Sequence, residues 1–294
     1  MIKKKYTFII LLSLVMTLLF ACGEAKNIWD MENYKNLDDI ISIEEVVDDG
    51  QETVITYKIR YKSDECEVVS YLSIPEKCLE KQEASPCIIF CRGGNRDYSA
   101  NTPESIANQA LAFDKIVFAS QYRGVDGGSG REEFGGADVN DVMKQIDLCE
   151  EFQFVDMDEL YMVGMSRGGM MTYEVIRQDE RIKKAVVVSG LADSFMWYEE
   201  RSDVRLIYAT LVGGTPEKIP DEFEKRSATY WAGELKCPVL IIHSKLDEKV
   251  SYAQAEKMAQ CLEDAGMEYK FVSYEDAVHG YHLEDIEIIT EWLK

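Results

Sequence analysis

The sequence predicts an α/β domain whose central sheet is mostly parallel, with helices on both faces. From about residue 85 onward, short apolar runs alternate with amphipathic stretches of helical length, which is the pattern of successive β-α-β units. Residues 51–294 contain no internal repeat and no low-complexity tract. Their number suits a single domain of this class, which can reach roughly 250 residues.

The expected elements begin with an antiparallel hairpin, because two strand-like runs flank the short polar segment 62–65. Strands and helices then alternate along the chain. In order, we predict strands at 53–61, 66–74 and 87–91, a helix at 102–113, a strand at 116–120, a helix at 138–152, a strand at 160–163 followed by a helix to 178, and strands at 184–189, 239–242 and 269–274.

Ser166 is the predicted nucleophile of a serine hydrolase. It lies in a Gly-Met-Ser-Arg-Gly-Gly segment directly after the apolar run 160–163. A strand that turns sharply into a helix holds such a serine in a strained conformation, with its hydroxyl at the edge of the sheet. A Cβ at Gly164 or Gly168 would collide with neighbouring elements in so tight a turn. The position between a strand pattern and a helix pattern favours this role over an ordinary loop serine.

The chain contains three histidines, and the catalytic base is expected to follow the nucleophile and the acid along the chain. His279, which is followed by Gly280 in the loop after strand 269–274, is the predicted base. His243 is expected to be a structural residue at a strand end. His282 lies at the expected start of the last helix, where a surface or capping role is predicted.

Asp247 is the predicted acid of the triad. It lies in the loop that follows the buried apolar run 239–242, a position from which a carboxylate can orient an imidazole. Glu248 and Asp276 are the alternatives, and the loop context favours Asp247.

Acyl transfer also requires hydrogen-bond donors for the oxyanion. One donor is expected to be the backbone N–H of Arg167, directly after the nucleophile, and the other to come from the loop 92–95, which follows the strand that ends at Cys91. Its two glycines allow the backbone to approach a substrate closely. A second glycine-rich segment, 122–131, lacks the Gly-Lys-Ser/Thr ending of a phosphate-binding loop.

The stretch 192–235 is long and mixed in character. We predict that it forms helices that cap the active site, although core packing would explain its aromatic residues equally well. The aromatic residues concerned are Trp197, Tyr198, Tyr208, Tyr230 and Trp231.

Composition excludes several functional classes. The formal net charge of −22 opposes binding to nucleic acid and electrostatic adsorption to anionic membranes. No spacing of His and Cys suggests a zinc site, so we expect neither a metal nor a cofactor. Cys87 and Cys91 lie two pleats apart on one face of a predicted strand, which is too far for a disulfide, so they are interpreted as small core residues.

Residues 1–21 have the pattern of an export signal. Lys3, Lys4 and Lys5 precede a nearly uninterrupted apolar run that ends in Leu-Phe-Ala-Cys. This ending resembles the lipobox of bacterial lipoproteins, in which the cysteine, here Cys22, is acylated. We therefore expect an exported protein that is lipid-anchored to the cell membrane and faces outside the cytoplasm; a plain secretory signal and an uncleaved anchor are the alternatives.

The segment 22–50 is acidic, and its apolar residues are scattered. We predict a tether between the membrane and the domain, within which residues 37–47 can form a short helix.

Further short blocks are spread over roughly residues 85–285. They are Tyr122-Arg123-Gly124 with Gly128 and Gly130, Phe134-Gly135, Asp138-Val139-Asn140-Asp141, Gly164-Met165-Ser166-Arg167-Gly168-Gly169, Arg226-Ser227, 237–243, Asp247 with Val250, and His279-Gly280. Together they resemble the catalytic domain of the prolyl oligopeptidase family, in its acylaminoacyl-peptidase and dipeptidyl-peptidase branch. The resemblance implies an α/β-hydrolase fold, a triad of Ser166, Asp247 and His279, and oxyanion N–H groups from Gly94 and Arg167.

The chain departs from the family pattern at two positions near the site. Arg92 stands where relatives carry Tyr or His before the paired glycines, and Ser244 stands where many carry Gly. Family peptidases also usually carry an N-terminal β-propeller, and we expect none here because only residues 1–50 precede the domain.

Three hypotheses on function follow. The first is a serine peptidase that cleaves peptide or amide bonds of short peptides, which the resemblance favours. The second is a carboxylesterase acting on small or carbohydrate-linked acyl esters, which an open site without a propeller favours. The third is a lipid-anchored binding protein without turnover, which the intact Ser, Asp and His set opposes.

Overall fold

The computed structural model describes residues 27–46, 53–81 and 83–294. Within this part of the chain the strands form one sheet in the order β1-β2-β3-β5-β4-β6-β7-β8-β9. The first three strands and β5 pair antiparallel, and the pairing from β5 to β9 is parallel. The strands are β1 Ile40–Val46, β2 Val54–Ser63, β3 Cys66–Pro75, β4 Ser85–Cys91, β5 Ile116–Ser120, β6 Val155–Met165, β7 Lys184–Val188, β8 Val239–Ser244 and β9 Tyr269–Tyr274.

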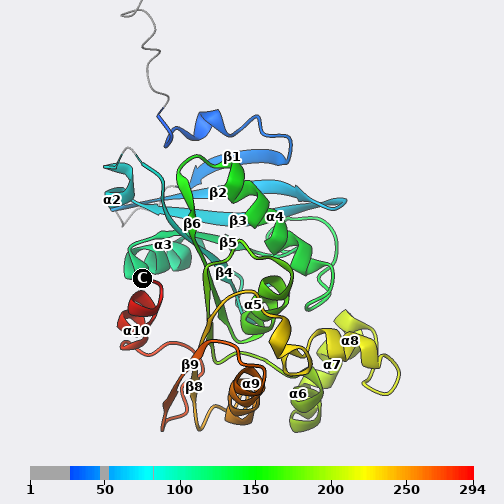
Figure 1. The fold of residues 1–294 in the computed structure, drawn as a ribbon. Coiled ribbons are helices and arrows are strands. Elements are labelled where there is room, and N and C mark those ends of the chain that lie inside the picture. Colours follow the sequence, from blue (N-terminus) through cyan, green and yellow to red (C-terminus); the bar gives the residue numbers. More distant parts are fainter. Residues whose placement is uncertain (1–26, 47–52, 82) are drawn as a thin grey trace, which may run out of the picture.

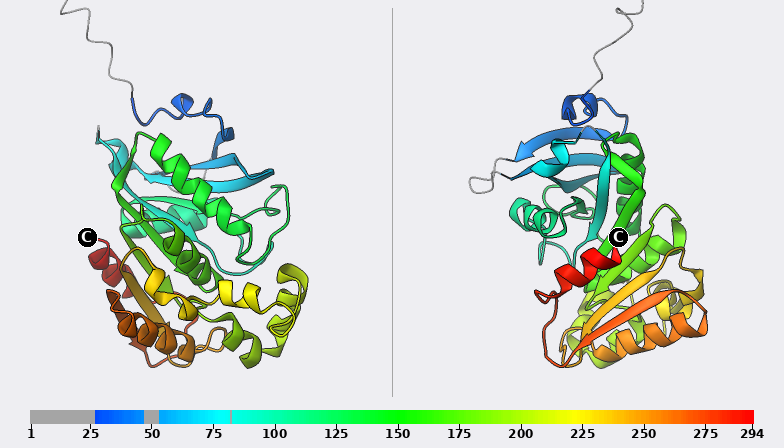
Figure 2. Two further views of the ribbon diagram at one scale, coloured as in Figure 1. Left: turned by 45° about the vertical axis from the view of Figure 1, so that its right-hand side comes forward. Right: turned by 60° about the vertical axis from the view of Figure 1, so that its left-hand side comes forward.

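Helices cover both faces of the sheet (Figures 1 and 2). One face packs against α3 and α10, and the other packs against α4, α5 and α9. The main helices are α2 Glu76–Leu79, α3 Pro103–Phe113, α4 Asp138–Glu151, α5 Arg167–Gln178, α6 Ser194–Glu200, α7 Arg205–Ile207, α8 Pro220–Lys225, α9 Tyr252–Asp264 and α10 Asp285–Trp292. The predicted α/β class is therefore confirmed.

Strand β4 shows why the central strands read as continuous apolar runs. Cys87, Ile89 and Cys91 belong to the core on one face, whereas Ile88 and Phe90 belong to the core on the other. A strand covered by helices on both sides needs apolar residues at every position. The two cysteines lie on the same face, as predicted, and all cysteines in the described residues are free.

The domain begins earlier than predicted. Residues 40–46 form strand β1 at the edge of the sheet, not a short helix over 37–47. Trp29 and Tyr34 are buried, and the Tyr34 ring packs edge-on against Phe152 and Phe154. The predicted acidic tether over 22–50 is thus corrected for residues 27–46, which are part of the folded domain.

The stretch predicted as a cap consists of short helical segments. Helices α6, α7 and α8 are joined by the single-turn segments η2 Ser202–Val204 and η3 Tyr208–Val212, and they project from one side of the domain (Figure 1). Several of its aromatic residues also belong to the core on the sheet face that α4, α5 and α9 cover. Within it, Tyr208 stacks on Phe223 with ring centroids 4.5 Å apart.

The predicted signal segment 1–21 and Cys22 lie outside the described residues. Among the helices that the structure does describe, none has both the length and the apolar character needed to cross a bilayer.

Candidate active site

Ser166 occupies the turn between β6 and α5. Its backbone has φ 57° and ψ −122°, a conformation that is strained for a residue with a side chain. The glycines on either side make the turn possible. A Cβ at Gly164 would lie 2.2 Å from the carbonyl oxygen of Gly168, and a Cβ at Gly168 would lie 1.9 Å from that of Cys91. Both distances agree with the clash that the sequence predicts at these two positions.

The structure brings Asp247 and His279 together, 32 residues apart in the chain. The Nδ1 of His279 lies 2.8 Å from Oδ2 of Asp247, and the imidazole is partly exposed whereas the carboxylate is buried. Two backbone amides, those of Lys249 and Val250, donate to Oδ1 of Asp247 at 2.8 and 3.1 Å. The backbone of the loop thus holds one carboxylate oxygen of Asp247, independently of the contact that the other oxygen makes with His279.

A second histidine also contacts Asp247. His243 is buried at the end of β8; its Nε2 lies 2.8 Å from the carbonyl oxygen of Val250 and 3.4 Å from Oδ2 of Asp247. Burial alone would raise the pKa of Asp247. Hydrogen bonds from His243, His279 and the Lys249 amide outweigh it and hold the pKa of this carboxyl below its ordinary value.

The alternative acid and base form a separate pair. His282 lies 2.9 Å from Asp276 and stacks on the ring of Tyr274 with centroids 3.8 Å apart. Its backbone amide donates to Asp285 in the first turn of α10, so His282 lies next to the start of this helix, but the N-cap residue is Glu284. Glu248 is exposed. Neither alternative acid contacts His279.

Ser166 and His279 line the same cavity, which has a volume of about 300 Å³. Within the described residues, no hydrogen bond joins the serine hydroxyl to the imidazole, and such bonds often tighten only when a substrate binds. One wall is aromatic: the rings of Phe134 and Trp197 are parallel, with centroids 5.8 Å apart. The predicted cap contributes the residues Trp197, Arg201, Asp203, Val204 and Ile207 to the lining.

The loop after β4 lies directly against the nucleophile. A Cβ at Gly93 would lie 3.1 Å from the Cβ of Ser166. Gly94 has φ +66°, and a Cβ there would lie 2.2 Å from the carbonyl oxygen of Tyr98, so this position requires glycine. Gly94 and Arg167, the predicted oxyanion donors, both line the cavity.

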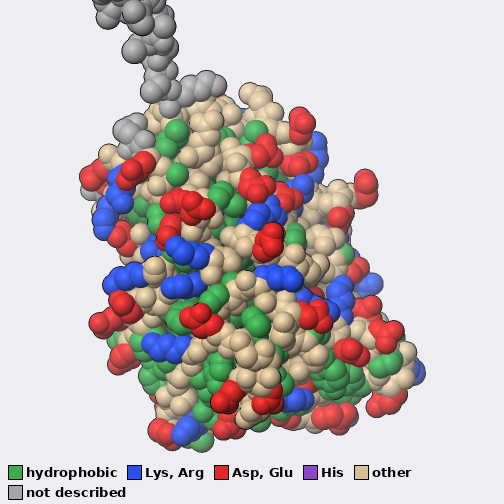
Figure 3. Space-filling model, in the orientation of Figure 1, with side chains coloured by type: hydrophobic (Ala, Val, Ile, Leu, Met, Phe, Trp, Pro, Cys, Tyr) green, Lys and Arg blue, Asp and Glu red, His purple; other side chains and the backbone are tan. Residues whose placement is uncertain are grey.

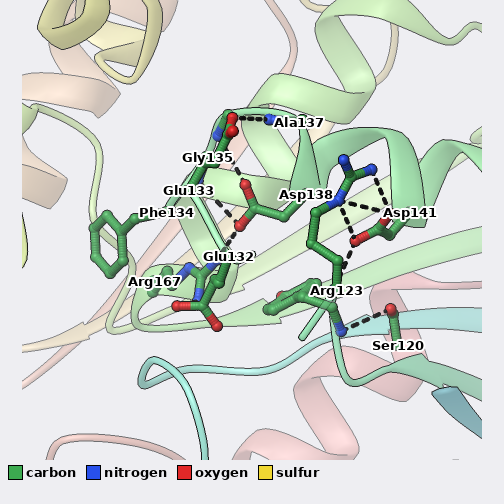
Figure 4. Close-up of polar contacts among 12 residues, drawn as sticks. Ser120, Arg123, Glu132, Glu133, Phe134, Gly135, Ala137, Asp138, Asp141 and Arg167 are labelled. Carbon is green, nitrogen blue, oxygen red and sulfur yellow. Dashed lines mark hydrogen bonds and ion pairs between the residues drawn. The ribbon is translucent and has the colours of Figure 1, made fainter. Parts of the chain in front are cut away.

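The side chain of Arg167 is buried, and Figure 4 shows it beside Glu132 and Asp138. Its guanidinium lies over the rings of Tyr122 and Phe134, 4.6 and 4.8 Å from their centroids. It also forms ion pairs with Asp138 and, at 2.9 Å, with Glu132. The charge of the Arg167 guanidinium is thus matched inside the protein by two carboxylates.

Sequence reasoning missed several polar residues that support this site. The contact of His243 with Asp247 could have been predicted, because the two residues are only four positions apart in the chain. The roles of Arg92, Glu132 and Asp138 had no comparable signal. The ion pairs that they form join residues 29 to 40 positions apart in the chain.

Comparisons with known proteins identify the family and several relatives of this chain. Residues 107–294 match the prolyl oligopeptidase family. The uncharacterized peptidase YtmA of Bacillus subtilis is 29% identical over 211 residues, which cover 70% of this chain and 82% of that protein. Dipeptidyl-peptidase 5 of Porphyromonas gingivalis is 22% identical over 73% of this chain, but this match spans only 34% of that longer protein.

Solved structures show the same α/β-hydrolase fold. The acylaminoacyl peptidase of Pyrococcus horikoshii superimposes with a TM-score of 0.68 at 21% identity, over 90% of this chain and 43% of that one. An acetyl xylan esterase from a Paenibacillus species superimposes with a TM-score of 0.70 at 14% identity, over 91% of both chains.

Proposed function

The chain belongs to the prolyl oligopeptidase family, and from this premise we propose that it is a serine hydrolase that cleaves peptide or amide bonds of short peptides. One observation carries the proposal. A serine on a strained turn between strand and helix shares a cavity with a histidine, and Nδ1 of that histidine is hydrogen-bonded to a buried aspartate.

In the proposed mechanism, Ser166 attacks the carbonyl carbon of the substrate while Nε2 of His279 accepts the hydroxyl proton. Asp247 holds Nδ1–H and so selects the tautomer that leaves Nε2 as the acceptor. The N–H groups of Gly94 and Arg167 stabilise the tetrahedral oxyanion. His279 then protonates the leaving group. A water molecule next attacks the acyl-enzyme while His279 accepts its proton, and transfer of that proton to the oxygen of Ser166 releases the acid.

The rival residues provide matched controls for the triad. Ser166→Ala should lower kcat by roughly 10⁴ to 10⁶, the scale of triad removal. Asp247→Asn and His279→Gln should each lose several orders of magnitude, whereas Asp276→Asn and His282→Gln remove a similar pair outside the cavity and should keep turnover near the wild type. Substantial turnover in Ser166→Ala would refute the assignment.

The leaving group distinguishes the first two hypotheses. One N-acyl amino acid, offered as its p-nitroanilide and as its p-nitrophenyl ester, tests both bonds on the same acyl group. Ser166-dependent cleavage of the anilide supports the peptidase. Cleavage of the ester alone favours the carboxylesterase, which the full-length likeness to an acetyl xylan esterase keeps as the second candidate. Failure of a fluorophosphonate probe to label the protein would favour a binding role.

We also propose that Cys22 carries a lipid anchor that holds the protein on the outer side of the cell membrane. The support is the export pattern of residues 1–21 and the Leu-Phe-Ala-Cys ending. Globomycin, which blocks cleavage of lipoprotein signals, should increase the size of the cellular protein. An unchanged size would refute the anchor and leave a plain secretory signal.

A further inference from the structure

We propose that the buried guanidinium of Arg92 is a positioning group for the oxyanion loop, residues 92–98: it holds the carbonyl of Gly93 so that the amide of Gly94 faces Ser166. The inference rests on the proposed hydrolase function. It concerns the position at which this chain departs from the family pattern of Tyr or His.

Arg92 does not reach the substrate cavity. Its side chain is 1% exposed, and it is absent from the residues that line the cavity. Its N–H groups donate to the carbonyl oxygens of Gly93 at 3.1 Å, Arg96 at 2.9 Å, Tyr98 at 3.4 Å and Gln121 at 2.9 Å. Arg92 therefore offers no side-chain donor to a substrate in the cavity, and its effect passes through the backbone.

The orientation of the Gly94 amide follows from peptide geometry. The carbonyl of Gly93 and the N–H of Gly94 belong to one planar trans peptide, so they point in opposite directions. Because Arg92 holds the carbonyl on the buried side, we infer that the amide is directed to the other side, toward the cavity that Gly94 and Ser166 both line. The amide of Gly94 has no acceptor among the residues that the structure describes, so it is available to an oxyanion.

The next peptide of the loop is held in the same way. Nη1 of Arg167 donates to the carbonyl oxygen of Gly94 at 3.2 Å. Two arginines thus fix two successive carbonyls from beneath the loop. Because Arg167 also supplies the second proposed oxyanion amide, both donors depend on a single buried cluster.

Glu132 connects the two arginines. Its carboxylate lies 2.9 Å from Arg167 and 3.4 Å from Arg92, and it accepts the backbone N–H of Arg96 at 3.0 Å. With Asp138, which pairs with Arg167 (Figure 4), the cluster has two positive and two negative groups. Because its formal net charge is zero, we infer that the cluster acts on catalysis mainly by orienting the peptides of the loop. A net electric field on the oxyanion is the smaller effect.

The test compares two buried arginines. Arg92→Met keeps the length of the side chain and removes every donor. Arg123→Met is the matched control, because Arg123 is also buried and is paired with Asp141 at 2.7 Å, yet it makes no hydrogen bond to the oxyanion loop. The probes are p-nitrophenyl acetate for turnover and phenylboronic acid, which forms a tetrahedral adduct with an active serine.

Arg92→Met should lower kcat by about 10- to 100-fold, below the 10²- to 10³-fold loss of a whole oxyanion donor. KM should change little, and inhibition by phenylboronic acid should weaken in parallel with kcat. Arg123→Met should destabilise the fold, but it should change kcat and the inhibition by phenylboronic acid much less than Arg92→Met does. If Arg92→Met matches Arg123→Met in kcat and in boronate inhibition, the inference is wrong.

Arg92→Lys keeps the result decisive if Arg92→Met does not fold. Lysine preserves the charge beside Glu132 but cannot reach the same set of carbonyls. It should still lower kcat with little effect on KM, and wild-type kinetics in this variant would overturn the inference. A wild type that neither turns over the ester nor reacts with a fluorophosphonate would overturn the proposed function itself.

Discussion

Asp247 accepts hydrogen bonds from the imidazole of His279 and from two backbone amides, and Nε2 of His243 lies 3.4 Å from its carboxylate. This arrangement places the pKa of Asp247 below its ordinary value. The stabilisation that it contributes is present at neutral pH and is lost only as pH falls through this lowered pKa. In the working range of the proposed enzyme the carboxylate is always charged.

The pH dependence of activity should therefore contain no step from Asp247. We expect the acid limb of kcat/KM for a p-nitrophenyl ester to fall with a slope of one proton, which reports a single essential base. A pH–rate profile between pH 4 and 9 measures this slope. A slope approaching two would show that a second group, such as the aspartate, titrates with the base.

Glu174 presents the opposite electrostatic case. It lies on α5, it is 2% exposed, and neither carboxylate oxygen has a hydrogen-bond partner in the described part of the protein. Desolvation raises the pKa of Glu174 well above its ordinary value, although Arg226 lowers it in part. The folded protein thus holds a proton that the unfolded chain releases at lower pH.

Stability should accordingly fall as pH rises above the ordinary range of a glutamate. The loss is about 1.4 kcal/mol for each pKa unit by which folding raises the carboxyl. Glu174→Gln removes this dependence, so the variant should gain stability relative to the wild type between pH 4 and 7, as urea unfolding at each pH measures. Glu180→Gln, at an exposed position, is the control. Parallel pH curves for wild type and Glu174→Gln would contradict the prediction.

At the scale of elements, helix α6 connects the cap to the loop that carries Asp247. The indole of Trp197 and the guanidinium of Arg201 both donate to the carbonyl oxygen of Lys249, at 2.9 and 2.7 Å. The amide of the same residue donates to Asp247. One residue therefore joins the cavity wall to the proposed catalytic acid.

Two tryptophans of the cap allow this connection to be tested. Trp197→Phe loses the bond to Lys249 but keeps a ring against Phe134, and it should cost about 1 kcal/mol of unfolding free energy. Trp231→Phe loses a similar bond, to the carbonyl of Glu224 at 3.0 Å, at a similar cost. Only Trp197 lines the cavity, so only Trp197→Phe should raise KM. An equal rise in KM for Trp231→Phe would contradict this assignment.

Element prediction succeeded where one local pattern decides the structure. Helix α3 begins one residue after the predicted start, because Thr102 and Ser105 form a capping box. Strand β1 was missed for an identifiable reason. A bulge between Ile40 and Ser42 shifts its register, so that buried Ile40 and Ile43 are three positions apart, which is a helical spacing.

In the candidate site too, some residues could be predicted from local sequence patterns and others could not. Chain order and strand ends were sufficient to select residues that the structure brings to one cavity, because parallel strands deliver their carboxyl ends to one edge of the sheet. The buried cluster of Arg92, Glu132, Asp138 and Arg167 was not predictable. Its pairing depends on how the starts of α4 and α5 and two separate loops meet in space, and no periodicity in the sequence encodes it.

For the whole molecule, charge is the dominant property. The sequence contains 54 acidic and 32 basic residues, which gives the net charge of −22. On the face seen in Figure 3, acidic and basic side chains are interspersed with apolar ones. The charges on this face do not gather into one patch. Over the whole chain, repulsion within the excess of negative charge opposes the compact state.

Added salt should therefore stabilise the protein. At about 0.1 M ionic strength the Debye length shortens to roughly 10 Å, and long-range repulsion between exposed carboxylates is screened. We expect Tm to rise between low salt and about 0.3 M NaCl, measured by calorimetry at pH 7. A matched series in sucrose separates charge screening from general solute effects. A Tm that falls with NaCl would show that the surface ion pairs outweigh the repulsion.

The position of Trp197 has an optical consequence. Of the four tryptophans in the chain, only Trp197 lines the cavity, where it stacks on Phe134. We expect a molecule that enters the cavity to change the surroundings of this indole and hence its emission, whereas Trp29, Trp231 and Trp292 lie outside the cavity lining. The protein thus carries its own fluorescent probe of occupancy, and unmodified compounds can be screened by titration without a chromogenic group.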